Sequence, residues 1–191
     1  MRIEHMSFSF GDKCVFDDFN LEICDGSFTA LMAPSGKGKT TLLRLIAGLI
    51  KPQSGKIDTD GQSVGIMFQE PRLFGQLTAI QNVMLVIKNR TSKNKQEYAM
   101  QLLKAFGVEE AADKYPDELS GGMAKRVSLA RAIAYNADIL LLDEPFSALD
   151  DQTKQSVMQA AGELLRGKTV LLVTHDQQEA SAFADNTVFL S

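Results

Sequence analysis

A glycine- and lysine-rich segment, Ala33–Thr41, separates the apolar run Phe28–Met32 from an amphipathic stretch that begins at Leu42. The segment matches the phosphate-loop pattern G-x-x-x-x-G-K-[ST], with alanine in place of the first glycine. Glycines allow backbone N–H groups to curl around phosphate oxygens, and a helix that follows directs its N-terminus at the anion. The position between a strand and a helix favours a phosphate site over the alternative, a flexible strand–helix turn. The alanine is tolerable only if Ala33 keeps a negative φ.

Short apolar runs and helical periodicity alternate along most of the chain. The first third alternates apolar and polar residues around Phe8 and Leu21, which predicts half-buried antiparallel strands. The segment from about Leu77 to Leu119 is mostly helical, with no buried-strand run. We therefore expect an α/β fold with a mainly parallel sheet and a helical insertion. Four runs with little alternation are expected to be parallel strands covered on both faces: Phe28–Met32, Val64–Phe68, Ile139–Leu142 and Val170–Val173.

Residues that can do chemistry follow each of these apolar runs. Ligands of open α/β sheets bind outside the carboxyl ends of the strands. Here those ends are followed by Ala33–Thr41, Gln69-Glu70, Asp143-Glu144 and Thr174-His175-Asp176. We expect these side chains to meet at one edge of the sheet and to form a single site.

The phosphate loop and the acidic pair predict chemistry on a nucleoside triphosphate. Lys39 is expected to meet the β- and γ-phosphates, and the Thr40 hydroxyl is expected to bind Mg²⁺. Asp143 suits a water-mediated contact with Mg²⁺, and Glu144 suits orienting or deprotonating the attacking water. An acidic pair at a strand end is often merely solvated, but beside a phosphate loop the functional interpretation is the better one.

A second segment with phosphate-binding character, Ser120-Gly121-Gly122, precedes a helix that we expect to start near Ala124. It combines a hydroxyl, glycine N–H groups and a helix N-terminus, which together can cradle a phosphate. The alternative is that Ser120 only caps the helix and that the glycines are flexible.

Together these segments resemble the ATP-binding cassette (ABC) family, and the resemblance runs in order over essentially the whole chain. Ser120–Gly122, with Lys125-Arg126 and Leu129–Ala132 after it, is similar to the signature motif and signature helix of the family. Adenylate-type kinases and small GTPases share the phosphate loop but lack these elements. Other segments resemble the Q-loop, the D-loop and the H-loop, and these are respectively Phe68–Glu70, Ser147–Asp150 and Val173–Asp176.

The resemblance implies a P-loop NTPase (RecA-like) core with an N-terminal antiparallel β subdomain and an inserted α-helical subdomain. The β subdomain and the core are expected to comprise residues 1–76 and 125–191, and the helical subdomain about residues 77–124, within a single ABC ATPase domain. A length of 191 residues is short for this family, so we expect no regulatory C-terminal domain.

The resemblance also implies roles for individual residues. Glu144 and His175 are expected to be catalytic, with His175 holding the γ-phosphate and the attacking water. Gln69 is expected to sense Mg²⁺ and that water, and to pass the signal to the helical insertion. The expected metal-binding residues are Thr40, Gln69 and Asp143. The expected nucleotide contacts are Phe10, Ser35, Gly36, Lys37, Gly38, Lys39, Thr40, Thr41, Ser120, Gly121, Gly122 and Asp150.

Several positions depart from the family pattern. Phe10 stands where tyrosine is commoner, and its ring can still stack on adenine, although Phe16 could serve instead. Lys37 occupies a position that usually holds a small residue, where it either adds positive charge near the phosphates or faces solvent. Met123 replaces the common glutamine of the signature, and we expect little loss of activity from it because it lies past the glycines.

The resemblance further implies a head-to-tail homodimer with two ATP molecules in its interface, which explains why one chain carries two phosphate cradles. A partner permease would be driven by this dimer, with a solute-binding protein involved indirectly and the chain held at the cytoplasmic face of the membrane. Phe68–Phe74 and the Gly-Gly-Met signature resemble the nitrate/sulfonate/taurine importer subgroup. The alternatives are a soluble ABC-type ATPase that switches a non-transport partner and a non-hydrolysing nucleotide-binding module.

Composition excludes several other classes of protein. The net charge of −4 argues against a nucleic-acid partner. The longest uncharged stretch, Leu73–Ile87, is too short and too polar to span a membrane, and no targeting segment is visible. The two cysteines, Cys14 and Cys24, form no metal-binding pattern and are expected to be reduced thiols.

Overall fold

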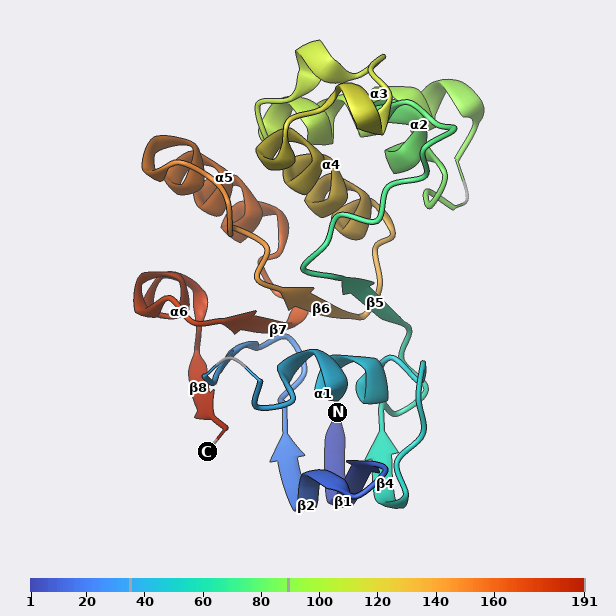
Figure 1. Cartoon of the computed structure of the whole chain (residues 1–191). Coiled ribbons are helices and arrows are strands. Elements are labelled where there is room, and N and C mark those ends of the chain that lie inside the picture. The colour runs from blue at the N-terminus through green and yellow to red at the C-terminus, as the bar shows by residue number, and fades with distance from the viewer. Residues whose placement is uncertain (35, 89, 191) are drawn as a thin grey trace. The chain divides into compact units, whose positions relative to one another are not determined.

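The structure is a computed structural model that describes residues 1–34, 36–88 and 90–190 (Figure 1). The chain forms two compact units. Unit 1 comprises Met1–Ile66, Ala137–Asp143 and Gly167–Ser191, and unit 2 comprises Met67–Asn136 and Glu144–Arg166.

Unit 1 contains a three-stranded antiparallel sheet in the order β2-β1-β4 (Figure 1). Its strands are β1 (Arg2–Phe10), β2 (Lys13–Glu22) and β4 (Ser54–Asp58). The pairing is irregular around His5, whose φ is 50°, and Gly55 opposite it has a φ of 80°. A Cβ on Gly55 would lie 2.3 Å from the carbonyl oxygen of His5, so only glycine allows the two strands to approach here.

The second sheet of unit 1 has five strands in the order β5-β6-β7-β3-β8. Strand β3 pairs in parallel with β7 and β8, and β6 pairs in parallel with β7. Every residue of β6 and β7 is buried, which accounts for the continuous apolar runs that predicted them. The strands are β5 (Val64–Met67), β6 (Ile139–Asp143), β7 (Thr169–Thr174), β3 (Phe28–Met32) and β8 (Asn186–Phe189).

Two helices of unit 1 follow strands of this parallel sheet. Helix α1 (Lys39–Ile46) follows β3 and contacts β6, and Leu42 and Leu43 of α1 are fully buried. Helix α6 (Gln177–Phe183) follows β7 and contacts β3, with the rings of Phe28 and Phe183 stacked 5.0 Å apart. The predicted α/β class with antiparallel strands near the N-terminus is therefore confirmed.

Unit 2 is helical (Figure 1). Helices α2, α3 and α4 contact one another, and their shared core includes Ala99, Leu102 and Leu129. Helix α4 begins at Gly121, three residues before the predicted start, because the Ser120 side chain accepts a hydrogen bond from the Met123 N–H and caps the helix. The helices are α2 (Ala79–Met84), α3 (Ser92–Ala105), α4 (Gly121–Ala134) and α5 (Asp151–Leu164), with 3₁₀ turns at Glu109–Ala111 and Pro116–Glu118.

Asn82 of α2 fixes the irregular segment that precedes this helix. The side chain is fully buried, and its amide donates to the carbonyl oxygens of Phe74, Leu77 and Thr78. Its Oδ1 atom accepts a hydrogen bond from the Phe74 N–H.

Within the part of the chain that the structure describes, no helix has the length and apolar character needed to cross a membrane.

Candidate functional site

The predicted phosphate loop joins β3 to α1 in unit 1. Gly36 and Gly38 have φ values of 81° and 84°, in the left-handed region that favours glycine. A Cβ on Gly38 would also lie 2.6 Å from Val15 Cγ1, so this position excludes any side chain. Ala33 is not among the described residues with a positive φ, which meets the condition for alanine at the first loop position. Ser35, a predicted nucleotide contact, lies outside the described residues.

Lys39 is buried at the first position of α1, with 9% of its surface exposed. Its ammonium group donates a 2.7 Å hydrogen bond to the main-chain oxygen of Ala33, across the loop. The ammonium therefore sits at the loop itself, where a phosphate group would meet it. Lys37, by contrast, is exposed.

The Thr40 hydroxyl and the Asp143 carboxylate, which are 103 residues apart in the sequence, meet in unit 1. Thr40 Oγ1 donates to Asp143 Oδ2 at 2.8 Å, and Asp143 is 2% exposed at the end of β6. A hydroxyl beside a carboxylate is an oxygen donor set that Mg²⁺ prefers. Among the described residues no group of three His, Cys, Asp or Glu side chains could form a metal site by itself. This fits Mg²⁺, which usually binds through one or two protein carboxylates, the phosphates of a nucleotide and water.

The residues after β7 form the predicted H-loop. His175 is exposed, and hydrogen bonds hold the residues on both sides of it. The buried Thr174 hydroxyl donates to Glu179 Oε2 at 2.5 Å and accepts a hydrogen bond from the Asp176 N–H at 3.0 Å. Sequence reasoning missed Glu179, which is 3% exposed; its position four residues after the histidine, on α6, carried no signal in the periodicity.

Phe10 and Phe16 were the two aromatic candidates for stacking on adenine. Phe10 is 52% exposed, and its ring meets Phe8 edge-on with centroids 4.8 Å apart. Phe16 is buried in the core of unit 1, and one edge of its ring lies 3.0 Å from where a Cβ on Gly38 would be. The exposed ring favours Phe10 for a stacking contact.

Two of the predicted catalytic side chains meet in unit 2. Gln69 Nε2 donates to Glu144 Oε2 at 3.1 Å. Glu144 follows the buried Asp143 directly in the sequence and has a φ of 47°, which is unusual for a residue with a side chain. The Gln69 carbonyl oxygen accepts a hydrogen bond from the buried Lys125 ammonium of α4.

The predicted signature and D-loop segments also lie in unit 2 and contact each other. A Cβ on Gly122 would lie 3.4 Å from both the Ala148 carbonyl oxygen and Leu149 Cδ2, so the two segments pack in van der Waals contact. Asp150 caps α5, and the hydrogen bond from the Thr153 N–H lowers the pKa of its carboxyl. Arg126 donates to the carbonyl oxygens of Phe106 and Gly107, and burial lowers the pKa of its guanidinium.

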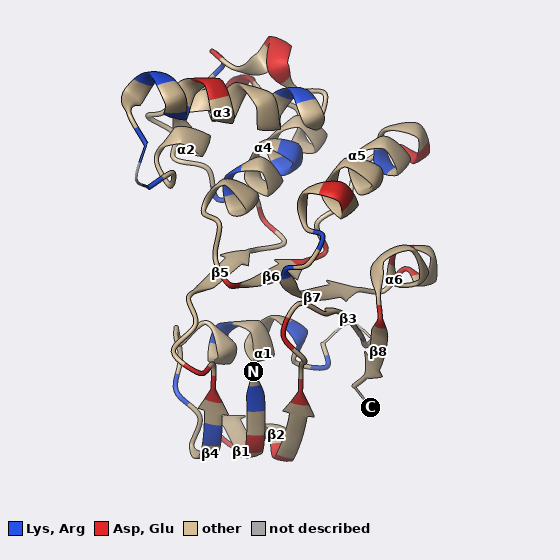
Figure 2. Cartoon of the chain, turned by 180° about the vertical axis from the view of Figure 1, so that it is seen from behind, with Lys and Arg blue, Asp and Glu red and all other residues tan. Residues whose placement is uncertain are grey.

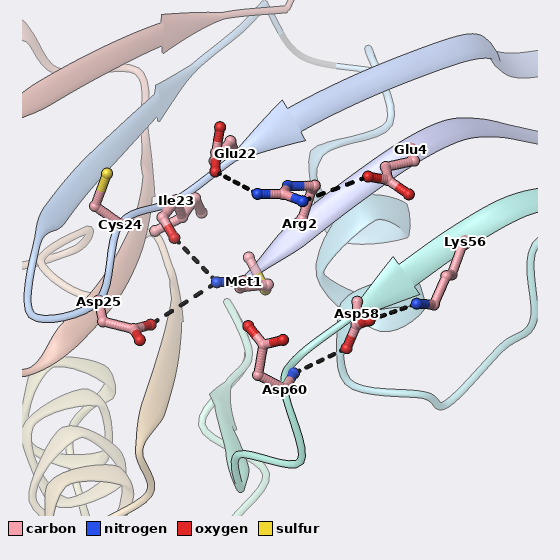
Figure 3. Close-up of a pocket in the computed structure, with 10 residues that line it drawn as sticks. All are labelled: Met1, Arg2, Glu4, Glu22, Ile23, Cys24, Asp25, Lys56, Asp58 and Asp60. Carbon is pink, nitrogen blue, oxygen red and sulfur yellow. Dashed lines mark hydrogen bonds and ion pairs between the residues drawn. The ribbon is translucent and has the colours of Figure 1, made fainter.

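A separate pocket of about 380 Å³ lies in unit 1 and contains none of the predicted site residues (Figure 3). The Met1 ammonium at its wall donates to the Ile23 carbonyl oxygen and lies 3.8 Å from Asp25. Both acidic and basic positions lie on β1 and β4, two of the strands that border it (Figure 2). Carboxylates outnumber cationic groups in the lining, which argues against a phosphate ligand. These carboxylates are Glu4, Glu22, Asp25, Asp58 and Asp60.

The predicted site residues thus form two groups, each defined within its own unit. Unit 1 brings together the glycine loop, Lys39, Thr40 and Asp143. Unit 2 brings Gln69 to Glu144 and the signature glycines to the D-loop. The first group can bind phosphate and a hard cation, and the second can orient a water molecule.

Comparison with known proteins agrees with this chemistry. A family model described as ABC transporter matches residues 16–147. A probable sulfate/thiosulfate import ATP-binding protein of Chlorella vulgaris is 42% identical over 202 residues, which cover 98% of this chain and 86% of the relative. An aliphatic sulfonates import ATP-binding protein of Burkholderia lata is 42% identical over 188 residues, which cover 95% of this chain and 58% of that protein.

A solved structure has the same fold over the entire chain. It is the dimeric structure of an ATP-binding cassette in a post-hydrolysis state, bound to ADP and Pi, and it superposes with a TM-score of 0.88. The two sequences are 32% identical, and the match covers 100% of this chain and 94% of the other. The chain spans only 57% of the length of two further sulfate/thiosulfate import relatives.

Proposed function

The chain belongs to the ABC transporter family as its ATP-binding cassette, an ATPase, and from that premise we propose that it closes as a head-to-tail dimer on two Mg-ATP to drive a permease. The observation that carries the ATPase assignment is the hydrogen bond from Thr40 to the buried Asp143 beside the phosphate loop. It supports the assignment, because a hydroxyl beside a carboxylate is a donor set that suits the Mg²⁺ of a bound nucleotide.

Binding of the nucleotide is assigned to unit 1. The N–H groups of the Gly36–Thr41 segment and the Lys39 ammonium would hold the β- and γ-phosphates, and the Phe10 ring would stack on adenine. Thr40 and Asp143 would hold Mg²⁺ together with Gln69, which is the third expected ligand. Mg²⁺ supplies charge neutralisation on the phosphate oxygens when it is bound.

Hydrolysis is assigned to Glu144, Gln69 and His175. Glu144 would accept a proton from the attacking water on its carboxylate, while the water oxygen forms a bond to the γ-phosphorus. The bond from that phosphorus to the β–γ bridging oxygen breaks, and ADP leaves with the electron pair. Gln69 would orient the water, and His175 would donate a hydrogen bond to the γ-phosphate.

The second phosphate cradle gives the reason for a dimer. Ser120, Gly121 and Gly122 lie at the N-terminus of a 14-residue helix, and Asp150 lies on the D-loop that packs against Gly122. We assign these residues to the ATP held by the phosphate loop of the other subunit. Each nucleotide would then have one cradle from each protomer.

The transport role rests on the names of the relatives. Those quoted above are import proteins for sulfate, thiosulfate and sulfonates, so we propose that the solute is a small sulfur oxyanion. The permease would hold the chain at the cytoplasmic face of the membrane, and a solute-binding protein would act indirectly. We also propose that residues 77–124 act as the helical subdomain that contacts the permease, and residues 1–76 and 125–191 as the β subdomain and catalytic core.

Affinity purification from detergent-solubilised membranes of the native cell tests the transport role. We expect a tagged chain to recover a polytopic membrane protein, and the purified complex to release phosphate from Mg-ATP. Recovery of soluble partners alone, with ATP hydrolysis intact, contradicts the transport role and favours an ABC-type ATPase that switches another assembly.

A further inference from the structure

One face of the signature helix α4 holds the chain segment that carries Gln69. Lys125, Ser128 and Arg131 are spaced three residues apart on this helix, and each donates to main-chain carbonyl oxygens of the segment Gln69–Arg72. Lys125 Nζ meets the Gln69 oxygen at 2.5 Å, and Ser128 Oγ meets the Pro71 oxygen at 3.0 Å. The Arg131 guanidinium reaches the oxygens of both Pro71 and Arg72 at 2.9 Å.

Lys125 and Ser128 are buried, and Arg131 is half-buried, although Lys125 and Arg131 are cationic. Lys125 is 3% exposed and Ser128 is 2% exposed. A buried ammonium group is costly unless it is hydrogen-bonded, and a charged donor makes a stronger hydrogen bond to a carbonyl than a neutral one. The Lys125 contact therefore fixes the position of the Gln69 peptide firmly. The segment itself has no helix or strand between β5 and α2 that could do this.

The Gln69 peptide determines where the Gln69 side chain can reach. That side chain donates to Glu144 Oε2 at 3.1 Å, so the ammonium of Lys125, the peptide of Gln69 and the carboxylate of Glu144 form a continuous chain of contacts within unit 2. A displacement of the peptide by about 1 Å is enough to misalign a reacting group and to slow a reaction by up to about 100-fold.

We propose that Lys125 is a positioning residue for ATP hydrolysis, which holds the Gln69 peptide so that the Gln69 side chain faces Glu144. The proposal rests on the ATPase function assigned above. Lys125 also lies one turn after Ser120–Gly122 on the same helix. The second phosphate cradle and the residue that holds the Gln69 peptide are thus parts of one helix.

A double-mutant cycle tests whether Lys125 acts through Gln69. Lys125→Met keeps an unbranched side chain of similar size and removes the donor. In the full-length chain we expect it to lower kcat for Mg-ATP about tenfold, with KM changed less than twofold. In a Gln69→Ala background nothing remains to be positioned, so Lys125→Met is expected to change kcat less than twofold.

Ser128→Ala is the matched control. It removes a buried donor from the same helix to the same segment, but the Pro71 oxygen keeps its hydrogen bond from Arg131, and the Gln69 oxygen is untouched. We expect its kcat to stay within twofold of wild type. Lys125→Gln, which is uncharged but keeps an amide donor, is expected to recover at least half of the activity lost in Lys125→Met.

Hydrogen–deuterium exchange over residues 68–74 supplies a readout that needs no hydrolysis. We expect faster exchange in Lys125→Met than in Ser128→Ala, at equal melting temperatures. An equal loss of kcat in the wild-type and Gln69→Ala backgrounds, or wild-type kcat and exchange in Lys125→Met, overturns the positioning role while the ATPase function stands. A wild-type chain that hydrolyses no ATP overturns the ATPase function and the positioning role together.

Discussion

Asp143 and Glu144 are consecutive carboxylates with different surroundings. Asp143 is 2% exposed and accepts a hydrogen bond from the Thr40 hydroxyl, whereas Glu144 is half-buried, has a φ of 47° and accepts one from the Gln69 amide. A buried carboxylate beside a hydroxyl suits a cation, and a more accessible one beside an amide suits a water molecule. We therefore propose that the pair divides metal binding and proton transfer between neighbouring residues.

Substitutions of these two carboxylates are expected to have separable effects. Glu144→Gln keeps the hydrogen-bonding shape but cannot accept the proton, so we expect hydrolysis to fall at least about 100-fold with ATP affinity retained. Asp143→Asn weakens the cation site, so we expect it to lose the Mg²⁺ dependence of nucleotide affinity. Isothermal titration with ATP, with and without Mg²⁺, and a phosphate-release assay measure both. Equal loss of affinity in the two variants contradicts the division of roles.

Gly38 and Gly36 offer a matched pair of positions in the phosphate loop. Both have a φ above 80°, so alanine at either one costs about 1 kcal/mol of backbone strain. At Gly38 the new methyl group would also lie 2.6 Å from Val15, whereas at Gly36 nothing described lies within 4 Å. We expect Gly38→Ala to lower the free energy of unfolding by about 3 kcal/mol in total, and Gly36→Ala by about 1 kcal/mol, in urea titrations. Equal losses would mean that the strand residue Val15 does not constrain the loop.

Secondary-structure elements with a strong apolar pattern were predictable, and weakly patterned ones were not. Strands β6 and β7 are wholly buried, so their sequences are continuous apolar runs. Strand β4 has no fully buried residue, and of the seven residues of α6 only Glu179 and Ala180 are buried, so neither produced a periodic signal. A segment with so few buried residues gives neither a continuous apolar run nor a regular alternation in its sequence.

The residues of the candidate site likewise include some that the sequence predicted and one that it did not. Gln69, Asp143, Glu144 and the phosphate loop were predicted because they follow strands of the parallel sheet in short, recognisable segments. Lys125 was not predicted as a site residue, because it acts through a main-chain carbonyl oxygen, and any residue supplies such an oxygen. Its position on a buried helix face, with Ser128 three residues later, was the available signal.

The Asp138 carboxylate, just before β6, is hydrogen-bonded to Ser63, just before β5. Asp138 Oδ2 accepts hydrogen bonds from the Ser63 hydroxyl and the Ser63 N–H, and these bonds lower the pKa of its carboxyl. A lowered pKa in the folded state stabilises the protein at pH values above the ordinary aspartate pKa, and this contribution is lost as the pH falls through the folded-state pKa.

Asp138→Asn is therefore expected to be less stable than wild type at pH 7, with a difference that shrinks below about pH 4. Urea unfolding at pH 7 and pH 3 measures both values, and Ser63→Ala, which removes the first donor, should reduce the same pH dependence. A stability difference that is unchanged between the two pH values would show that the charge of Asp138 contributes nothing.

Nucleotide binding is expected to stabilise the whole molecule. ATP with Mg²⁺ at about 100 times its dissociation constant adds about 2.7 kcal/mol of apparent stability to a protein that binds it only when folded. Thermal unfolding of the wild-type chain should therefore shift upward with Mg-ATP and should not shift with Mg²⁺ alone. The Lys39→Ala variant, which loses the buried ammonium at the loop, is the control in which the shift should vanish. A shift retained in Lys39→Ala places the nucleotide elsewhere.

We propose that ATP joins two copies of this chain, because each copy would supply one phosphate cradle at the glycine loop and another at Ser120–Gly122. Size-exclusion chromatography with light scattering on Glu144→Gln, with and without Mg-ATP, tests it most directly. We expect a monomer without nucleotide, a dimer with Mg-ATP, and a monomer again when Ser120→Arg is added. A Glu144→Gln chain that binds ATP and stays monomeric, or a dimer that survives Ser120→Arg, contradicts it.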